Sequence, residues 1–371
     1  MKNNWFQRYL LPGLIFQSAI IAGAYGSGQE LAQFFLGHGP LGGLLGMLVT
    51  MFVFSIVLMA AYEFSRRFQL FDYRSFCKKL LGPFWPLYEI LFILIMILVI
   101  SIIGAAAGDI LRDTFDLPTI VGTASVMILI ALLVFFGTPA IERFLALWSF
   151  VLYGTYVCFF AWHLIQYGPD IIANLTSIDV QGNWIRSGIL YSGYNMATVP
   201  VLIFCIRHQR RRREALIAGA LAGPLAMIPA MLFFVTMIGQ YDVLVGGGGD
   251  GALPVSILLN ALSNAGLFVL LFPIVLFGTF VETGAAIIHG FNERLNRTFA
   301  EKGRAMPKWM RPVVAAFILI AAVTLADVVG LTTLVAEGYG TITWGFLLVM
   351  VLPLLTYGVW QLVRSAEESD G

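Results

Sequence analysis

Long runs of apolar residues, separated by short polar segments, follow one another along the whole 371-residue chain. A run of about 20 mainly apolar residues is long enough to cross the hydrocarbon core of a bilayer as a helix. The pattern therefore predicts an all-α integral membrane protein with about ten transmembrane helices. The expected spans are 9–36, 40–64, 84–111, 119–137, 142–166, 184–206, 214–239, 260–292, 311–328 and 332–363.

Two of these runs are interrupted by glycine and polar residues at matching places. The first interruption is Ala22–Glu30, in the first run, and the second is Ser187–Asn195, in the sixth. A helix that opens within lipid leaves backbone N–H and C=O groups unpaired, which is tolerated only beside a cavity or inside protein. Paired interruptions in corresponding halves of a chain point to the binding site of a secondary transporter.

The interruptions divide the chain into two halves of five spans, repeat one at about 9–167 and repeat two at about 184–363. Because five is an odd number, the halves would insert in opposite directions and form an inverted repeat. We therefore expect a single transmembrane transporter domain over residues 1–371, with spans 1 and 6 broken and with short cytoplasmic tails.

Composition and charge agree with a membrane protein and orient it. Hydrophobic residues make up 59% of the chain and charged residues 12%, which is about half the charged share of soluble domains. All 22 lysines and arginines except Arg112 and Arg186 fall on one side of the ten-span layout. The positive-inside rule then places both termini in the cytoplasm. Basic segments between spans are expected to contact the lipid bilayer and not nucleic acid.

The glycine motif in the first span resembles that of a known family. Residues 26–28, Gly-Ser-Gly, are similar to the break that the amino-acid–polyamine–organocation (APC) superfamily carries there. Residues 26–30, followed by Phe34 and Phe35, resemble the YkvI-like amino-acid permeases of bacteria. The resemblance implies the LeuT fold, with spans 1, 2, 6 and 7 as a moving bundle and spans 3, 4, 8 and 9 as a scaffold. It also implies the plasma (inner) membrane of a prokaryote.

The chain departs from the superfamily directly after this motif. Gln29 and Glu30 stand where an apolar residue usually follows. Ordinary amino-acid selectivity does not follow from the motif for that reason.

Both interruptions carry residues that suit a small ligand. Glycines let the backbone approach a ligand, and free N–H donors at a half-helix suit a substrate carboxylate. Tyrosine rings can stack on a cation, and a carboxylate within a span faces a cavity, a cation or a proton. Close helix packing and stabilisation of a helix end are the alternatives. The candidate substrate-binding residues are Tyr25, Gly26, Ser27, Gly28, Glu30, Tyr191, Tyr194 and Asn195.

A second group of candidates concerns the coupling ion. In the LeuT fold, hydroxyls of span 8 and carbonyls of span 1 form a sodium site, which here points to Gly23, Thr279 and Thr283. Glu282 lies beside these hydroxyls, and Glu30 is a carboxylate of the broken first span. Glu30, Thr279, Glu282 and Thr283 are therefore the candidate ion-coupling residues. Either Na+ or H+ would serve, and no further cofactor is expected.

Two acidic residues on the outer side are candidates for a gate. Asp109 ends span 3, and Glu337 lies in the outer half of span 10. The fold implied by the resemblance often builds its outer gate from spans 1 and 10. Arg112 and Arg186 are the candidate partners, and simple solvation at the surface is the alternative.

Together these features predict an ion-coupled secondary active transporter of a small amino acid or amine, working by alternating access across the plasma membrane. The sequence carries no nucleophile constellation, metal-ligand spacing or phosphate loop of the kind that marks an enzyme. A nutrient-sensing receptor subunit of the same fold and a channel are the alternatives. A channel needs a continuous polar pore, whereas the polar residues here cluster at two breaks. Substrate identity, transport direction and oligomeric state stay open.

Overall fold

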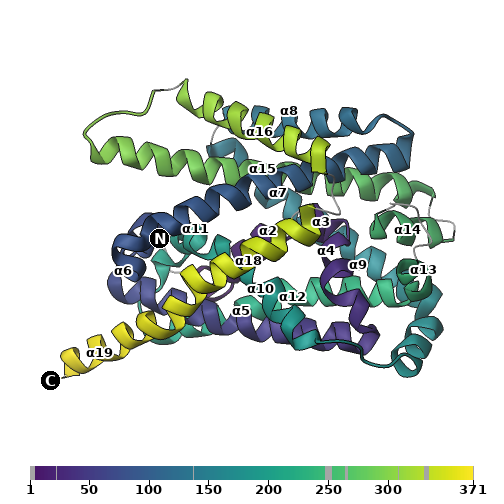
Figure 1. Ribbon diagram of the computed structural model, residues 1–371, viewed down its shortest axis with the longest axis horizontal. Coiled ribbons are helices and arrows are strands. Elements are labelled where there is room, and N and C mark those ends of the chain that lie inside the picture. The colour runs from purple at the N-terminus through teal and green to yellow at the C-terminus, as the bar shows by residue number, and fades with distance from the viewer. Residues whose placement is uncertain are drawn as a thin grey trace.

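The computed structural model describes residues 5–21, 23–136, 138–246, 253–263, 266–307, 309–329 and 334–370. Its regular structure within these ranges is helical throughout, as the apolar runs predict. Figure 1 shows long helices that run beside one another along the longest axis of the molecule. Seven helices in the described part of the chain are long and apolar enough to cross a membrane. The count of ten spans and the inverted repeat stay predictions.

The first half of the chain begins with a first span that is divided into short pieces. These are α1 (Trp5–Tyr9), α2 (Leu11–Ile20), α3 (Gly23–Gly26), α4 (Gln29–Phe35) and the 3-10 turn η1 (Leu36–His38). The remaining elements are α5 (Pro40–Phe68), α6 (Tyr73–Leu81), the 3-10 turn η2 (Gly82–Phe84), α7 (Trp85–Phe115), α8 (Thr119–Phe136) and α9 (Thr138–Ser177).

The second half repeats the alternation of long spans and short connecting helices. It contains α10 (Trp184–Asn195), η3 (Met196–Thr198), α11 (Val199–Leu202), η4 (Ile203–His208), α12 (Arg212–Ile238), α13 (Tyr241–Val245), α14 (Pro254–Ala261), α15 (Gly266–Glu301) and α16 (Met310–Val329). The last span alternates between helix types, through the π-helical η5 (Leu334–Tyr339), α18 (Gly340–Phe346), the π-helical η6 (Leu347–Val351) and η7 (Leu354–Gly358), and α19 (Val359–Asp370).

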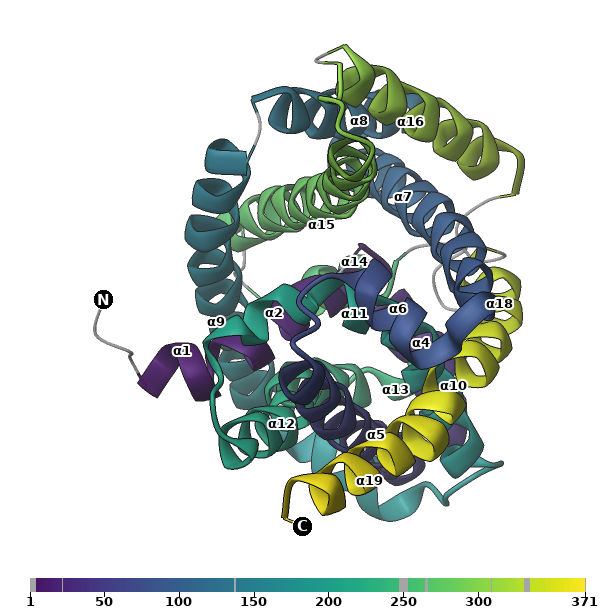
Figure 2. The same cartoon turned by 90° about the vertical axis from the view of Figure 1, so that its left-hand side faces the viewer.

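The long helices form two groups. Figures 1 and 2 show α7, α8, α15 and α16 together on one side, and α2, α5, α10 and α12 on the other. These are the sets that the family resemblance implies as scaffold and bundle. The motion of one set against the other stays a prediction.

Glycines set the closest helix contacts in the second group. At Gly219 and Gly223 of α12, a β-carbon would collide with backbone atoms of Met59 and Met51 in α5. Helices in membranes associate through such small-residue faces because lipid supplies no hydrophobic force between them. The pair α5–α12 is accordingly the most extensively packed of the molecule.

The first span is broken where the sequence predicts a break. Helix α2 ends at Ile20, and Ser27 and Gly28 form a turn between α3 and α4. Gly28 has φ +82°, a left-handed conformation that glycine adopts without steric cost. The Gly-Ser-Gly segment therefore lets the chain leave one helix and start the next in mid-span.

In the sixth span, the departure from regular α-helix lies later in the chain than predicted and is a 3-10 turn. Regular helix continues through Tyr191–Gly193 to Asn195, so the expected unwinding there is wrong, and a 3-10 turn follows at η3. The glycines serve close packing instead. A β-carbon at Gly188 would collide with the Gly46 carbonyl of α5, and one at Gly193 would press on Thr343 and Leu347 of the last span.

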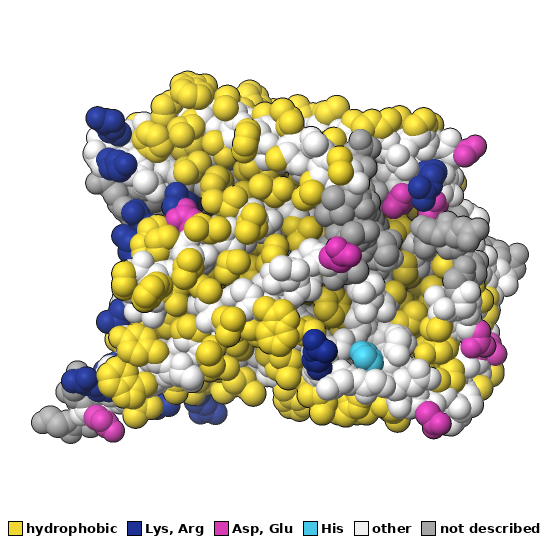
Figure 3. All heavy atoms as spheres, in the orientation of Figure 1, with side chains coloured by type: hydrophobic (Ala, Val, Ile, Leu, Met, Phe, Trp, Pro, Cys, Tyr) yellow, Lys and Arg dark blue, Asp and Glu magenta, His cyan; other side chains and the backbone are white. Residues whose placement is uncertain are grey.

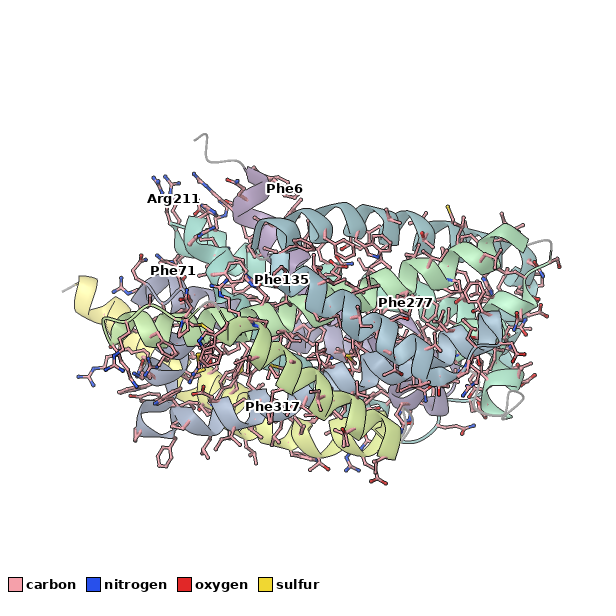
Figure 4. The ribbon with its side chains drawn as sticks, turned by 90° about the horizontal axis from the view of Figure 1, so that it is seen from above. Phe6, Phe71, Phe135, Arg211, Phe277 and Phe317 are labelled. Carbon is pink, nitrogen blue, oxygen red and sulfur yellow. The ribbon has the colours of Figure 1, made fainter. Side chains whose placement is uncertain are left out.

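One end of the molecule is strongly basic. Figure 3 shows lysine and arginine side chains gathered at the left end, where Figure 1 places α6 and α19. Figure 4 places Phe6 of α1 and Arg211 at this same end. The first and last described helices therefore lie toward one end, which agrees with termini on one side of a membrane. That this side is the cytoplasm stays a prediction.

Candidate functional site

The break in the first span lies in the interior, with its open backbone groups bonded to other helices. The Tyr156 hydroxyl of α9 donates to the Gly26 carbonyl at 3.1 Å. The backbone N–H of Val255 in α14 donates to the Ser27 carbonyl at 3.0 Å. Tyr25, Gly26, Ser27 and Gly28 are all buried. The structure thus satisfies two carbonyls that lipid would leave unpaired, and the donors come from two separate elements, α9 and α14.

Glu30 lies one residue into α4 and is the central feature of the site. Its side chain is buried, and the Tyr194 hydroxyl of α10 donates to its Oε2 atom at 2.6 Å. The hydroxyl of Tyr339 in η5 faces the same carboxylate, as does that of Tyr191, which completes no hydrogen bond among the described residues. A hydrogen bond of this length to an ionised carboxylate is strong. Spans 1, 6 and 10 therefore meet at one carboxylate.

Aromatic rings surround this carboxylate. The Tyr194 and Tyr339 rings stack with centroids 4.1 Å apart and planes 10° from parallel. Tyr191 packs edge-on against Phe34, Phe35 and Tyr194. Ring faces carry partial negative charge and attract cations, so the rings and Glu30 favour the same sign of ligand. The acidic side chain also stabilises the N-terminal end of α4, and this structural role does not conflict with binding.

A second polar cluster joins α2 to α15. The Ser18 hydroxyl donates to Oε1 of Glu282 at 2.9 Å, and the Tyr153 hydroxyl of α9 donates to Oε1 of Gln17 at 2.7 Å. Glu282 is buried. The Thr283 hydroxyl is buried too and has no hydrogen-bond partner within the described residues. The buried Glu282 carboxylate and the Ser18 hydroxyl supply oxygen atoms, the ligand type that hard cations prefer.

Thr279 and Gly23 are two further residues predicted for the coupling ion. The Thr279 hydroxyl donates to the Val275 carbonyl of its own helix at 3.0 Å. Gly23 begins α3, which packs against α15. A sodium site at Gly23, Thr279 and Thr283 stays a prediction.

Asn195 and the predicted gate are arranged differently from the expectation. The Asn195 amide donates to the Tyr191 carbonyl of its own helix at 2.9 Å. Asp109 pairs with Arg112, one turn away on α7, at 3.0 Å, whereas Glu337 is exposed. Asp109 thus forms an ion pair with Arg112, one of the two predicted partners. Within the described residues, no hydrogen bond connects Asp109 to Glu337.

Three residues that contact the site, Tyr339, Tyr156 and Ser18, are not among those predicted from the sequence. Tyr339 lies between two glycines of the last span, which is a local signal, but its contact with Glu30 depends on tertiary packing. Tyr156 lies in α9 before the kink at Tyr167, and Ser18 lies in α2 before the break of the first span. Nothing in their sequence neighbourhood marks them.

Several solved structures have a backbone similar to that of this chain over most of its length. A crystal structure of MhsT in complex with L-phenylalanine matches with TM-score 0.65 and 15% identity, over 94% of this chain and 96% of that one. A substrate-bound Na+-coupled sialic acid symporter matches with TM-score 0.65 and 13% identity, over 94% and 82%. Mhp1 in its inward-facing conformation matches with TM-score 0.54 and 18% identity, over 92% and 76%.

The chain has the LeuT fold. At these identities the likeness to transporters shows the fold alone. The sequence matches no protein-family model and no curated protein. The narrower resemblance to YkvI-like permeases therefore stays a prediction, while the fold that the resemblance implied is confirmed.

Proposed function

We propose that this protein is an ion-coupled secondary active transporter of a small amino acid or amine. The observation that carries the proposal is the buried Glu30 carboxylate at the break of span 1, bonded by Tyr194 of span 6 and faced by Tyr339 of span 10. A buried carboxylate is costly in a membrane unless it serves a cation or a proton. MhsT binds L-phenylalanine, and the sialic acid symporter is Na+-coupled. Those solved proteins of the same fold support the class of function.

The geometry supports a positively charged group as the part of the substrate that lies at Glu30. The carboxylate and the Tyr194–Tyr339 stack favour a cation. An ammonium group, shared by amino acids and amines, meets this requirement. The residues proposed for the substrate are Tyr25, Gly26, Ser27, Gly28, Glu30, Tyr191 and Tyr194, with Tyr339 added.

The cluster around Glu282 supports a separate place for the coupling ion. It connects α2, which precedes the break, to α15 of the scaffold group through the Ser18–Glu282 hydrogen bond. An ion bound there would favour the arrangement in which the two helices touch. Binding and release of Na+ or H+ would then bias the motion of the bundle, because a ligand shifts an equilibrium by its preference for one state.

The test is uptake by the purified full chain in proteoliposomes. Radiolabelled amino acids and amines are screened with an imposed sodium gradient, an imposed pH gradient, or neither. We expect accumulation of at least one compound that depends on one of the gradients. Binding without uptake would favour the receptor alternative, and gradient-independent ion flux would favour a channel.

Two substitutions separate the two roles. Glu30→Gln removes the charge that holds the substrate cation, so substrate affinity should fall about 10- to 100-fold, the loss expected for a hydrogen bond to a charged group. Glu282→Gln should abolish gradient-driven accumulation and leave substrate exchange intact. Glu367→Gln, in the exposed part of α19, is the matched control. Wild-type accumulation in both buried variants would show that neither carboxylate takes part.

A further inference from the structure

An apolar groove opens on the surface at the basic end of the molecule. It encloses about 520 Å3 between the η2 turn and the last span. One wall comes from the end of α6, η2 and the start of α7, and the other from η6 and η7. The lining residues used below are Lys79, Phe84, Leu87, Leu348, Pro353 and Tyr357.

The rim of this groove is apolar and faces outward. Phe84 is 66% exposed, Leu348 61% and Tyr357 48%. In a chain with seven candidate membrane helices, such large exposed apolar side chains face lipid. The groove is therefore open to the bilayer, and an acyl chain is the apolar matter available to fill it.

Positive charge lies at one end of the groove. Helix α6 buries Tyr73, Phe76, Cys77 and Leu80 and exposes Lys78 and Lys79. Lys79 lines the groove, with its Nζ atom 4.6 Å from the centre of the Phe68 ring, and Lys78 Nζ lies 5.5 Å from the centre of the Trp85 ring.

Lys79 thus lines one end of the apolar groove, and Lys78 is the adjacent exposed lysine of the same helix. Trp and Tyr are enriched at membrane interfaces, at the level of the lipid headgroups. Trp85, Tyr357 and Trp360 are aromatic residues of this kind near the groove.

We propose that this groove binds one anionic phospholipid, with the phosphate at Lys78 and Lys79 and an acyl chain along Leu87, Leu348 and Pro353. The positive charge at one end of the groove and the apolar lining together fit an amphiphile with a negative head. A soluble anion would gain nothing from the lining, and a zwitterionic lipid would gain little from the lysines. Two lysines near a surface contribute about 1 kcal/mol each to the binding of anionic lipid.

The position of the groove gives the lipid a way to act on the protein. Its second wall consists of two π-helical segments, η6 and η7. Irregular helical turns of this kind occur at functional positions and add an extra residue to a turn. Further along the same span, Tyr339 stacks on Tyr194 beside Glu30. A chain packed against η6 and η7 would favour one arrangement of the last span.

The experiment counts bound lipids on the purified full chain by native mass spectrometry. Dioleoyl phosphatidylglycerol and dioleoyl phosphatidylcholine are titrated separately, and glycerol phosphate is added as a headgroup without chains. We expect one tightly bound phosphatidylglycerol, weaker phosphatidylcholine, and no competition by glycerol phosphate. Equal affinity for the two lipids would overturn the proposal, as would displacement of the lipid by glycerol phosphate alone.

Two pairs of variants test the two halves of the site. Lys78→Gln with Lys79→Gln should weaken phosphatidylglycerol about 30-fold, whereas Lys302→Gln, exposed elsewhere, should leave its affinity unchanged. Leu348→Trp should fill the groove and lower affinity for both lipids. Leu352→Trp changes a neighbouring exposed residue that does not line the groove. Unchanged lipid binding in the double lysine variant, or equal effects of the two tryptophan variants, would refute the assignment.

Discussion

At the scale of single residues, Glu30 shows what the sequence can and cannot reveal. A glutamate directly after a glycine break in an apolar run is conspicuous, because an ionisable group within a span is expensive. Its partners are not conspicuous. Tyr194 and Tyr339 are 145 residues apart in the chain, and only the packing of the spans stacks their rings. The identity of the acid was predictable, whereas its environment depends on tertiary structure.

A double-mutant cycle measures the bond between Glu30 and Tyr194. Tyr194→Phe removes the donor that bonds the buried Glu30 carboxylate at 2.6 Å, which costs about 1.5–3 kcal/mol of unfolding free energy for a bond to a charged group. In a Glu30→Gln background the same change should cost clearly less, because the acceptor is then neutral. Denaturant unfolding of the purified protein in detergent gives both values. Equal costs in the two backgrounds would mean that the hydroxyl does not stabilise the carboxylate.

Tyr88→Phe is the matched control for this cycle. The Tyr88 hydroxyl donates to the neutral Ala197 carbonyl at 2.6 Å and is buried like that of Tyr194. Its loss should cost about 0.5–1.5 kcal/mol. Its cost should also be the same with and without Glu30→Gln, because the two sites share no partner.

At the scale of helices, the sequence predicts spans better than it predicts what a glycine does. The expected spans 40–64 and 119–137 correspond to α5 (Pro40–Phe68) and α8 (Thr119–Phe136), since the thickness of the bilayer sets the length of an apolar run. Glycine clusters are ambiguous because they permit both open backbone and close packing. In span 1 the cluster opens the helix at Gly28, whereas in span 6 Gly188 and Gly193 bring helices together.

The α5–α12 contact gives a prediction at this scale. Gly223→Ala places a methyl group against the Met51 carbonyl and Ser55 of α5, so the helices must separate. Overpacking of this kind costs about 1–3 kcal/mol, which should lower the midpoint of denaturant unfolding. Gly154→Ala is the control, because Gly154 in α9 has open space where the methyl group would go. A midpoint for Gly223→Ala at or above that of the control would contradict the packing.

At the scale of the whole molecule, different elements connect the helices on either side of the central site. At one end, α14 bonds to the Ser27 carbonyl and is fastened to α9 through the His163 ring and the Leu258 carbonyl. At the basic end, Arg8 of α1 forms an ion pair with Glu214 of α12 at 2.8 Å. Because Glu30 is buried, we expect access to it to require one of these connections to open. Sequence periodicity predicts the helices, but such long-range connections follow from the assembled fold.

The Arg8–Glu214 ion pair leads to a prediction about access from the basic end. Glu214 also accepts hydrogen bonds from the backbone N–H groups of Arg210 and Arg211, so it holds α1 to the start of α12. Arg8→Ala removes the half-buried partner, and a loss of about 1 kcal/mol increases the open population about 5-fold. Cys205, buried in η4 beside α1 and α2, reports the opening through its rate of reaction with a water-soluble maleimide.

The measurement uses a background in which Cys77 and Cys158 are serine, so that Cys205 is the reacting thiol. Labelling should be about 5-fold faster in Arg8→Ala and in Glu214→Gln than in the parent, because either change breaks the same ion pair. Arg186→Ala, an exposed arginine of α10, should leave the rate unchanged. If Arg8→Ala and Arg186→Ala label Cys205 at the same rate, the ion pair does not hold the basic end closed, and closure there must rest on the packing of α1 and α2 against α12 alone.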